Sequence, residues 1–305
     1  MTTHNAPKRA KNLEEFLGMS GKFLTEEGHQ AGLAFQPRST DVIISPFAKS
    51  GTTWLQQIAH GLRTRGSMDF EEITAVTPWI EVAQDYGWDL EAEQIAAPRL
   101  FKSHCTWDEI PKGGRYICAI RNPHDVAVSF YRFLEGWWFE TDSISLEEFI
   151  HARVTHAPAE KGYWHHLISW WEQRENENVL LLCFEDMKTD LPATVQTIAQ
   201  FMGITLDDEL LDIVVRQSSK GFMLAHQSHF DDHLIQTQFE RHGGPPSDLN
   251  TAKITAGATN HKRYQLSPAI KDELDAIWHK MIYTQFGFKD YAALRTAIMQ
   301  LQSGE

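Results

Sequence analysis

Short apolar runs that end in polar turns recur along the chain. Brief runs rich in Val, Ile and Leu are typical of strands that are buried on both faces of a parallel sheet. Residues 42–44, 116–120 and 179–184 have this form, and residues 99–102 are a candidate fourth strand. The pattern therefore predicts a small sheet whose strands are widely separated in the sequence.

Apolar residues spaced three and four apart predict helices after these strands. Start and stop signals support several of these helices. Asn122 before Pro123 and Ser267 before Pro268 are start signals, and Gly203 is a stop signal. Two segments, residues 136–164 and 221–261, show no regular period, and we expect irregular loops there of the kind that form lids and substrate loops. The helices are expected over residues 54–62, 123–134, 191–202 and 268–286.

Strands that alternate with helices predict an α/β domain with a central parallel β-sheet flanked by helices. We expect a single domain over residues 13–295, because the candidate motifs described below are spread across most of the chain. Residues 1–12 are expected to be a disordered lead-in and residues 296–305 a C-terminal tail. Ligands of such folds bind at the carboxyl ends of the strands.

Charge and cysteine content narrow the class of protein. The formal net charge is −13 over 305 residues, which argues against nucleic acid or an anionic membrane as a partner. An anionic ligand would need a local cluster of donors. Three cysteines without Cys-x-x-Cys spacing favour a reducing compartment over a disulfide framework. A polar N-terminus and the absence of a long apolar run favour a soluble, cytoplasmic protein.

Residues 45–54, after the first strand, are a candidate anion site. A strand-to-helix turn with glycine directs backbone N–H groups and the positive end of a helix at an anion. Lys49 adds a charge, and Thr52 and Thr53 add hydroxyl donors, although a plain polar connection explains the same residues. The lysine precedes the glycine, so the segment is not a Walker A loop.

Lys49-Ser50-Gly51-Thr52-Thr53-Trp54 after a strand resembles the 5′-phosphosulfate loop of the cytosolic sulfotransferases. The resemblance implies a P-loop NTPase-like sulfotransferase fold. It also implies 3′-phosphoadenosine-5′-phosphosulfate (PAPS) as co-substrate, 3′-phosphoadenosine 5′-phosphate (PAP) as product, and no metal requirement. In that family the lysine contacts the transferring group, the threonines bind the 5′-phosphate and the tryptophan stacks on adenine. The family usually has Pro-Lys, whereas Phe47 and Ala48 intervene here.

Residues 98–104 resemble a second segment of the family. Lys102 and His104 lie two residues apart and project to the same side of an extended chain. A histidine, whose reference pKa is near neutrality, can take the proton of an acceptor, and Lys49 with Lys102 can stabilise charge on the bridging oxygen. A histidine alone is more often structural, but the neighbouring motifs favour catalysis. Cys105 is interpreted as a packing residue.

Residues 121–131 resemble a third segment, in which the arginine and the serine bind the 3′-phosphate. The resemblance assigns these roles to Arg121 and Ser129, and it implies that Ser129 also touches the loop lysine. A guanidinium at a strand end can meet a phosphate through two parallel hydrogen bonds. Without the resemblance, Arg121 would be read as an ion-pair partner of Asp125.

Two further segments resemble parts of the family that contact adenine. They assign Phe184 and Ser218 to the adenine, with the tyrosine of the family replaced by Phe184. Glu185 and Asp186 are expected to organise the loop that carries Phe184.

The chain departs from the family where an Arg-Lys-Gly loop closes on the 3′-phosphate. Residues 253–263 keep a glycine but have no adjacent Arg-Lys pair, and Lys253, Lys262 and Arg263 are the candidate replacements. The vertebrate-type dimerisation motif is also absent, so the oligomeric state is left open.

Histidines and aromatic residues outside these motifs allow further interpretations. The spacing of His226, His229 and His233 is loosely compatible with zinc, but a polar substrate loop explains the same residues. Residues 137–139, two tryptophans and a phenylalanine, are candidates for the acceptor pocket, and Trp170 with Trp171 for the core.

The leading hypothesis is a PAPS-dependent sulfotransferase that transfers a sulfuryl group to a hydroxyl or amine of a small-molecule acceptor by in-line displacement. One alternative is a non-catalytic protein that binds PAPS or PAP on the same fold. Another is a small-molecule kinase, which would require a Walker A loop and Mg²⁺.

Overall fold

A computed structural model describes residues 8–20, 22–155, 162–246, 253–254 and 262–303. The strands are β1 (Val42–Ile44), β2 (Leu100–Lys102), β3 (Arg115–Ile120) and β4 (Val179–Cys183). The helices are α1 (Leu13–Ser20), α2 (Glu26–Leu33), α3 (Thr52–Thr64), α4 (Ile73–Val76), α5 (Ala83–Tyr86), α6 (Pro123–Trp137), α7 (Leu146–Ile150), α8 (Tyr163–Trp171), α9 (Phe184–Thr189), α10 (Leu191–Met202), α11 (Asp208–Gln217), α12 (Lys220–Ala225), α13 (His233–Arg241), α14 (Pro268–Trp278), α15 (Thr284–Phe286) and α16 (Tyr291–Ser303). Short 3₁₀ turns are η1 (Ile80–Val82), η3 (Gln227–Phe230) and η4 (Lys262–Tyr264), and π-helical turns are η2 (His151–Thr155) and η5 (His279–Tyr283).

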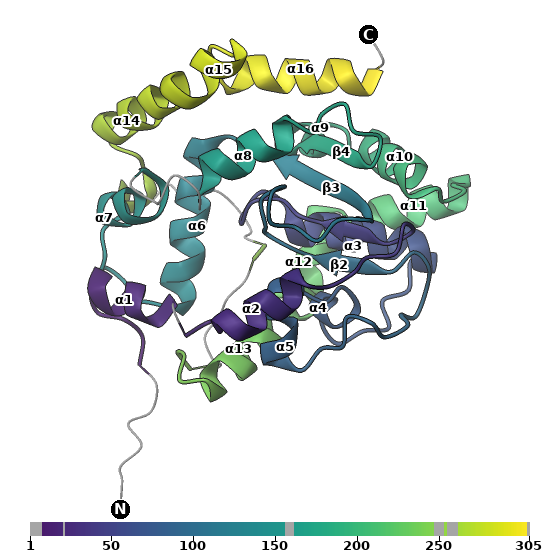
Figure 1. Cartoon of the computed structure of the whole chain (residues 1–305), viewed down its shortest axis with the longest axis horizontal. Coiled ribbons are helices and arrows are strands. Elements are labelled where there is room, and N and C mark those ends of the chain that lie inside the picture. The colour runs from purple at the N-terminus through teal and green to yellow at the C-terminus, as the bar shows by residue number, and fades with distance from the viewer. Residues whose placement is uncertain (1–7, 21, 156–161, 247–252, 255–261, 304–305) are drawn as a thin grey trace, which may run out of the picture.

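The four strands form one parallel sheet in the order β2-β1-β3-β4 (Figure 1). Val42 of β1 lies opposite both Leu100 of β2 and Arg115 of β3. The chain therefore leaves β1 to form β2 on one side and then crosses over to form β3 on the other. Ligands of open α/β sheets bind in the crevice at such a reversal, beyond the carboxyl ends of the strands.

Helices cover both faces of the sheet. Successive side chains of a strand point to opposite faces, so neighbouring residues of β1 pack against different helices. Val42 and Ile44 pack into an apolar cluster with α3, α10 and α11. Ile43 belongs to the larger cluster on the other face, which includes residues of α6, α8, α14 and α16. Figure 1 shows α14, α15 and α16 as a row along one side of the molecule.

The structure confirms the predicted parallel sheet and all four predicted strands, with a one-residue change at three boundaries. β2 begins at Leu100 and β3 at Arg115. Phe184 begins α9 instead of ending β4. Asn122 and Ser267 cap α6 and α14 as predicted, and Gly203 ends α10 in a left-handed conformation with φ of 72°. The helix expected over residues 268–286 is continuous but contains the π-helical turn η5.

The prediction of irregular loops over residues 136–164 and 221–261 was wrong for much of their described length. Ser145 starts α7 through a capping box with Glu148, and the second segment contains α13. These helices have only 5 and 9 residues, too few to display a helical period clearly in the sequence. Their start signals were the available evidence, above all the Ser-x-x-Glu pattern at Ser145.

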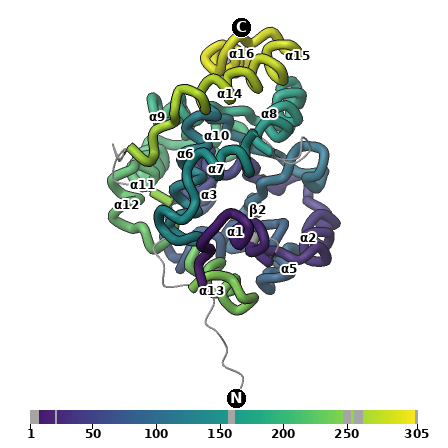
Figure 2. The backbone as a smooth tube through the Cα atoms, turned by 90° about the vertical axis from the view of Figure 1, so that its left-hand side faces the viewer, coloured from purple at the N-terminus to yellow at the C-terminus, as the bar shows by residue number. Residues whose placement is uncertain are grey.

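The expected lead-in and tail are partly built into the fold. Ala10 is buried, its N–H donates to the carbonyl of Trp138, and its carbonyl accepts from Glu140. At the other end, α16 runs to Ser303, and its Ile298 is buried against the core. Figure 2 shows α16 at the opposite end of the molecule from α13. No helix in the described part of the chain is both long and apolar enough to cross a membrane.

Candidate active site

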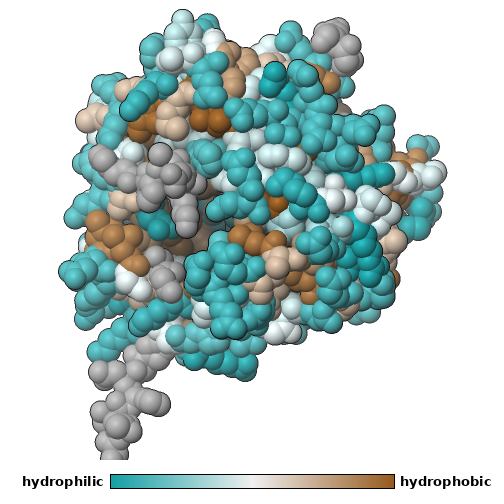
Figure 3. Space-filling model, in the orientation of Figure 1, coloured by the Kyte–Doolittle hydropathy of each residue, from teal (hydrophilic) through white to brown (hydrophobic). Residues whose placement is uncertain are grey.

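A cavity of about 1580 Å³ lies at the carboxyl edge of the sheet. The segment after each strand contributes to its wall: Lys49 after β1, His104 after β2, Arg121 after β3 and Phe184 after β4. On the face shown in Figure 3, the surface is hollowed left of centre between hydrophobic and hydrophilic side chains. The residues singled out from the sequence therefore meet in one place, as the parallel sheet predicts.

The loop between β1 and α3 absorbs the two residues that separate Pro46 from Lys49. The N–H of Ser50 donates to the carbonyl of Phe47 over 3.0 Å, which closes a turn. Lys49 is the third residue of that turn and has φ of 70°, the positive value that a type II turn requires there. The turn leaves the lysine side chain on the wall of the cavity.

Buried polar atoms without a partner mark this loop as an anion site. Ser50 Oγ, Thr52 Oγ1, Arg121 Nε and Ser218 Oγ are buried and have no hydrogen-bond partner among the described residues. Thr52, Arg121 and Ser218 line the cavity, whereas Ser50 is not among the lining residues. Orphaned polar groups of this kind are rare and costly inside proteins, so the three at the cavity indicate a polar ligand. Hydroxyls and a guanidinium at a helix start fit the phosphate groups of a nucleotide.

Two lysines face the cavity without a carboxylate in direct contact among the described residues. Lys49 Nζ lies 4.0 Å from the ring centroid of Phe133, and Lys102 Nζ lies 3.8 Å from that of Trp79. Burial, together with the nearby charge of Lys253, lowers the pKa of Lys49 to about 7. Burial also lowers the pKa of Lys102 to about 8. A bound anion would stabilise both ammonium groups.

His104 is held in one orientation by its neighbours. Its Nδ1 donates to the carbonyl of Pro46 over 2.7 Å, because a carbonyl can only accept, and its backbone N–H donates to Glu81 over 2.6 Å. Burial and the charge of Lys102 lower the pKa of His104 to about 3, so the ring is neutral. Nε2 therefore carries the lone pair, as a general base requires.

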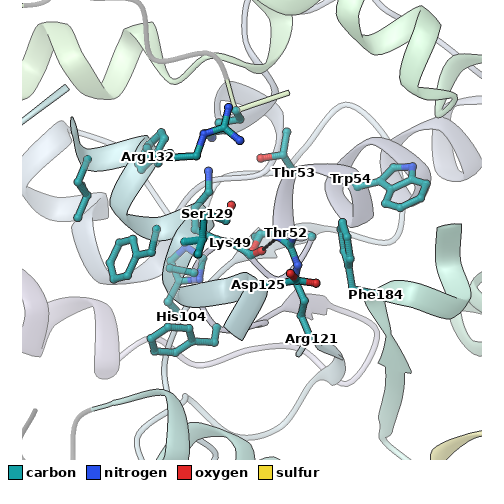
Figure 4. A pocket seen from close by; sticks show the side chains of 18 of the residues that line it. Lys49, Thr52, Thr53, Trp54, His104, Arg121, Asp125, Ser129, Arg132 and Phe184 are labelled. Carbon is teal, nitrogen blue, oxygen red and sulfur yellow. Dashed lines mark hydrogen bonds between the residues drawn. The ribbon is translucent and has the colours of Figure 1, made fainter. Parts of the chain in front are cut away.

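Arg121 approaches the loop rather than Asp125. One of its guanidinium nitrogens donates to the carbonyl of Lys49 over 2.7 Å, and its guanidinium carbon lies 4.3 Å from the ring centroid of Phe184. Ser129 follows two turns along α6 and lines the same cavity (Figure 4). The ion pair between Arg121 and Asp125 that the sequence allowed is not found in the part of the chain that the structure describes.

The rings assigned to adenine border one end of the cavity. The centroids of Trp54 and Phe184 lie 5.8 Å apart with the rings nearly edge to face, and Trp54 Nε1 donates to the carbonyl of Ser218 over 2.8 Å. Glu185 holds this region in place, since its carboxylate accepts from the N–H of Asn122 and from the hydroxyl of Tyr291. Asp186 pairs with Arg295 of α16.

The comparison with known families agrees with this geometry. The family model for the sulfotransferase domain matches residues 39–286. The chain belongs to the sulfotransferase family. This confirms the family and the enzyme class that the loop at Lys49 predicted.

Curated relatives and solved structures resemble this sulfotransferase over most of its length. Human sulfotransferase 2A1 is 33% identical over 193 residues, which cover 61% of this chain and 67% of that protein. Rat sulfotransferase 1C2 is 30% identical over 230 residues, which cover 69% of this chain and 75% of that protein. Mouse SULT7A1, solved with PAP, has a TM-score of 0.63 and 19% identity over 91% of this chain and 95% of that one. Retinol dehydratase, solved with retinol and PAP, has a TM-score of 0.65 and 18% identity over 90% of this chain and 95% of that one. Both structures confirm the sulfotransferase fold.

A buried acidic residue of this sulfotransferase was not singled out for the site from the sequence. Asp232 lines the cavity, is buried, and forms an ion pair with Lys253. Burial alone would raise the pKa of Asp232, but the charges of Lys253 and Lys102 outweigh it and lower the pKa to about 2. Asp232 lies in the sequence between His229 and His233, and no motif of that segment indicates a place in the cavity.

The three histidines of that interpretation bind separate partners. His226 Nδ1 contacts the carbonyl of Phe222, and His229 Nδ1 contacts the carbonyl of Phe70. His233 pairs with Asp231 and Glu71. Within the described ranges, no three His, Cys, Asp or Glu residues are grouped so that they could hold a metal ion.

Aromatic side chains form much of the cavity wall, and the ring centroid of Trp79 lies 5.1 Å from that of His104. Trp137 and Trp138 line the cavity as expected, but Phe139 does not, since it is fully buried and packs against Phe16 with centroids 5.5 Å apart. Trp170 and Trp171 belong to the core, as predicted. The other aromatic residues of the wall near the loop and α6 are Phe16, Phe23, Phe47, Trp79, Phe130 and Phe133.

Proposed function

We propose that the protein transfers the sulfuryl group of PAPS to a hydroxyl or amine of a small-molecule acceptor, with His104 as general base. One observation carries the proposal. His104 is neutral, its Nδ1 is occupied by the carbonyl of Pro46, and it lines the same cavity as Lys49 and Lys102. Related proteins of this fold have been solved with PAP, which supports PAPS as the donor.

The residues around the loop have a consistent division of labour in this proposal. The loop from Lys49 to Trp54 binds the 5′ end of the donor, Arg121 and Ser129 bind its 3′-phosphate, and Trp54 and Phe184 hold the adenine, with Ser218 beside it. The buried hydroxyls and the Arg121 Nε that have no partner support these assignments. Hydrogen bonds to charged groups supply both affinity and orientation.

Sulfuryl transfer requires the acceptor to lose one proton and the bond between sulfur and the bridging phosphate oxygen to break. Nε2 of His104 is the atom that takes the proton of the acceptor as its oxygen or nitrogen bonds to sulfur. Lys49 and Lys102 stabilise the charge that develops on the bridging oxygen as its bond to sulfur breaks. Both lysines must be protonated for this task.

The wall near His104 selects the acceptor. Rings from α6 and from the loop after β1, including Phe47, Phe130 and Phe133, offer an apolar surface to a ligand body. Burial of apolar area is the main source of affinity in such pockets. We infer an acceptor with an aromatic or extended apolar body and one nucleophilic group.

The test measures PAP formation from PAPS with a panel of phenols, alcohols and amines. The substitution His104→Ala should lower turnover by about 10²–10⁴-fold. The affinity for PAP, measured by calorimetry, should stay close to that of the wild type. His29→Ala is the matched control, since His29 also lines the cavity. Tight PAP binding by the wild type without turnover on any acceptor would favour a non-catalytic protein instead.

A further inference from the structure

Arg132 lies on the wall of the cavity one helical turn beyond Ser129. Residues three apart on a helix lie on the same side, and both of these side chains line the cavity. In Figure 4 the Arg132 side chain extends from α6 toward Thr53, over the region where Ser129 lies. The guanidinium therefore faces the cavity from the same side of α6 as Ser129, one of the two residues assigned to the 3′-phosphate.

The charge of Arg132 is not neutralised within the described residues. No carboxylate there pairs with it, and its guanidinium carbon lies over the ring of Tyr264, 5.0 Å from the centroid. The hydroxyl of Tyr264 donates to the buried carboxylate of Glu135 over 2.6 Å. Tyr264 thus gives Arg132 a fixed platform without cancelling its charge.

Two of the basic residues expected to replace the Arg-Lys-Gly loop are neutralised by carboxylates. Lys253 forms its ion pair with Asp232. Arg263 pairs with Glu135 and with Asp142, each over 2.9 Å. Lys262, the third candidate, is exposed and is not among the residues that line the cavity. A further cation for the 3′-phosphate, beside Arg121, is therefore sought among the other basic residues of the wall.

We propose that Arg132 binds the 3′-phosphate of the donor beside Ser129 and supplies the charge that the missing Arg-Lys pair would provide. A guanidinium can meet a phosphate through two parallel hydrogen bonds, which a helix-mounted arginine held on a ring can present without reordering a loop. The inference rests on the proposed donor site, because Arg121 and Ser129 define where the 3′-phosphate lies.

The experiment compares the affinities of PAP and of adenosine 5′-monophosphate, which lacks the 3′-phosphate, by isothermal titration calorimetry. Arg132→Ala should lower the preference for PAP by about tenfold to about a hundredfold, and leave the affinity for the monophosphate unchanged. Arg132→Lys should lie between the wild type and Arg132→Ala. Arg153→Ala is the matched control, because Arg153 also lines the cavity and also lies over a ring, that of Phe16.

Arg121→Ala separates failure of this inference from failure of the donor site. If Arg121→Ala lowers the preference for PAP and Arg132→Ala does not, Arg132 has no role at the 3′-phosphate. If neither variant changes the preference, the proposed donor site is itself wrong. Equal losses for both nucleotides in Arg132→Ala would also overturn the inference. Arg132→Gln, which keeps most of the stem, repeats the measurement if Arg132→Ala lowers the thermal midpoint.

Discussion

Lys49 and Lys102 sit close to deprotonation in the free protein, and this sets how donor binding depends on pH. Their pKa values are about 7 and about 8, well below that of a lysine in water, because burial disfavours the charged form. An anionic donor favours the charged form and raises both values. The protonated lysines bind the donor, so affinity should fall as the pH rises through this range.

Donor binding is expected to add about 1.4 protons to the two lysines at pH 8, about 0.9 at Lys49 and about 0.5 at Lys102, and about 0.1 at pH 6, where both are already protonated. Calorimetric titration of PAP in buffers with different ionisation enthalpies measures this number directly. Lys49→Arg removes one titrating group, since a guanidinium stays protonated, and should reduce the uptake. Binding at pH 8 without proton uptake would show that the lysines do not contact the anion.

At the scale of an element, the loop from β1 to α3 depends on a glycine. Gly51 has φ of 102°, and a Cβ at this position would meet a ring carbon of Phe184 at 3.0 Å. Gly51→Ala should therefore destabilise the protein by at least about 1 kcal/mol and weaken PAP binding. Chemical denaturation and calorimetry measure the two effects.

Gly87 provides the control for backbone strain alone. Its φ is 75°, but a Cβ there would meet nothing within 4 Å. Gly87→Ala should lower stability and leave the affinity for PAP unchanged. Equal losses of affinity in the two variants would mean that the loop at Gly51 does not form the donor site.

The elements differ in how far the sequence could predict them. The strands were predictable because short runs such as residues 116–120 are buried on both faces and carry no polar residue. The helix α7 was missed because its five residues show no period, although its capping box was visible. Local signals locate an element well only where the element is long or its burial is uniform.

At the scale of the whole molecule, the same limit applies to the site. Lys49, His104 and Arg121 were predictable because their segments resemble those of the cytosolic sulfotransferases. Parallel strands then bring these segments to one edge of the sheet. Asp232 reaches the cavity by tertiary packing of a segment that no motif links to the strands. Lys253 was a candidate for the 3′-phosphate, but its ion pair with Asp232 could not be predicted from the sequence. The sequence shows Arg132 close to Ser129, but it does not show which other basic residues are paired with carboxylates. The proposed role of Arg132 depends on those ion pairs, which only the structure shows.

The molecule as a whole is negatively charged, whereas its cavity is lined mainly by positively charged residues. The chain has a formal net charge of −13, yet the cavity is lined by nine Lys and Arg residues against four Asp and Glu. An anionic nucleotide is thus repelled by the molecule at long range and attracted by the cavity at short range. Salt shortens the reach of both fields, but it removes the distant one first.

The association rate of PAP should therefore rise, not fall, as salt increases from about 10 mM to about 100 mM, because the Debye length shrinks from about 30 Å to about 10 Å. Higher salt then screens the cavity itself, and the dissociation rate should increase. Stopped-flow fluorescence can follow both rates, with Trp54 as the reporter within the site. Uncharged adenosine is the control and should show neither trend. An association rate that falls steadily from the lowest salt would show that the nine basic residues, rather than the acidic surface, set the field that an approaching nucleotide meets.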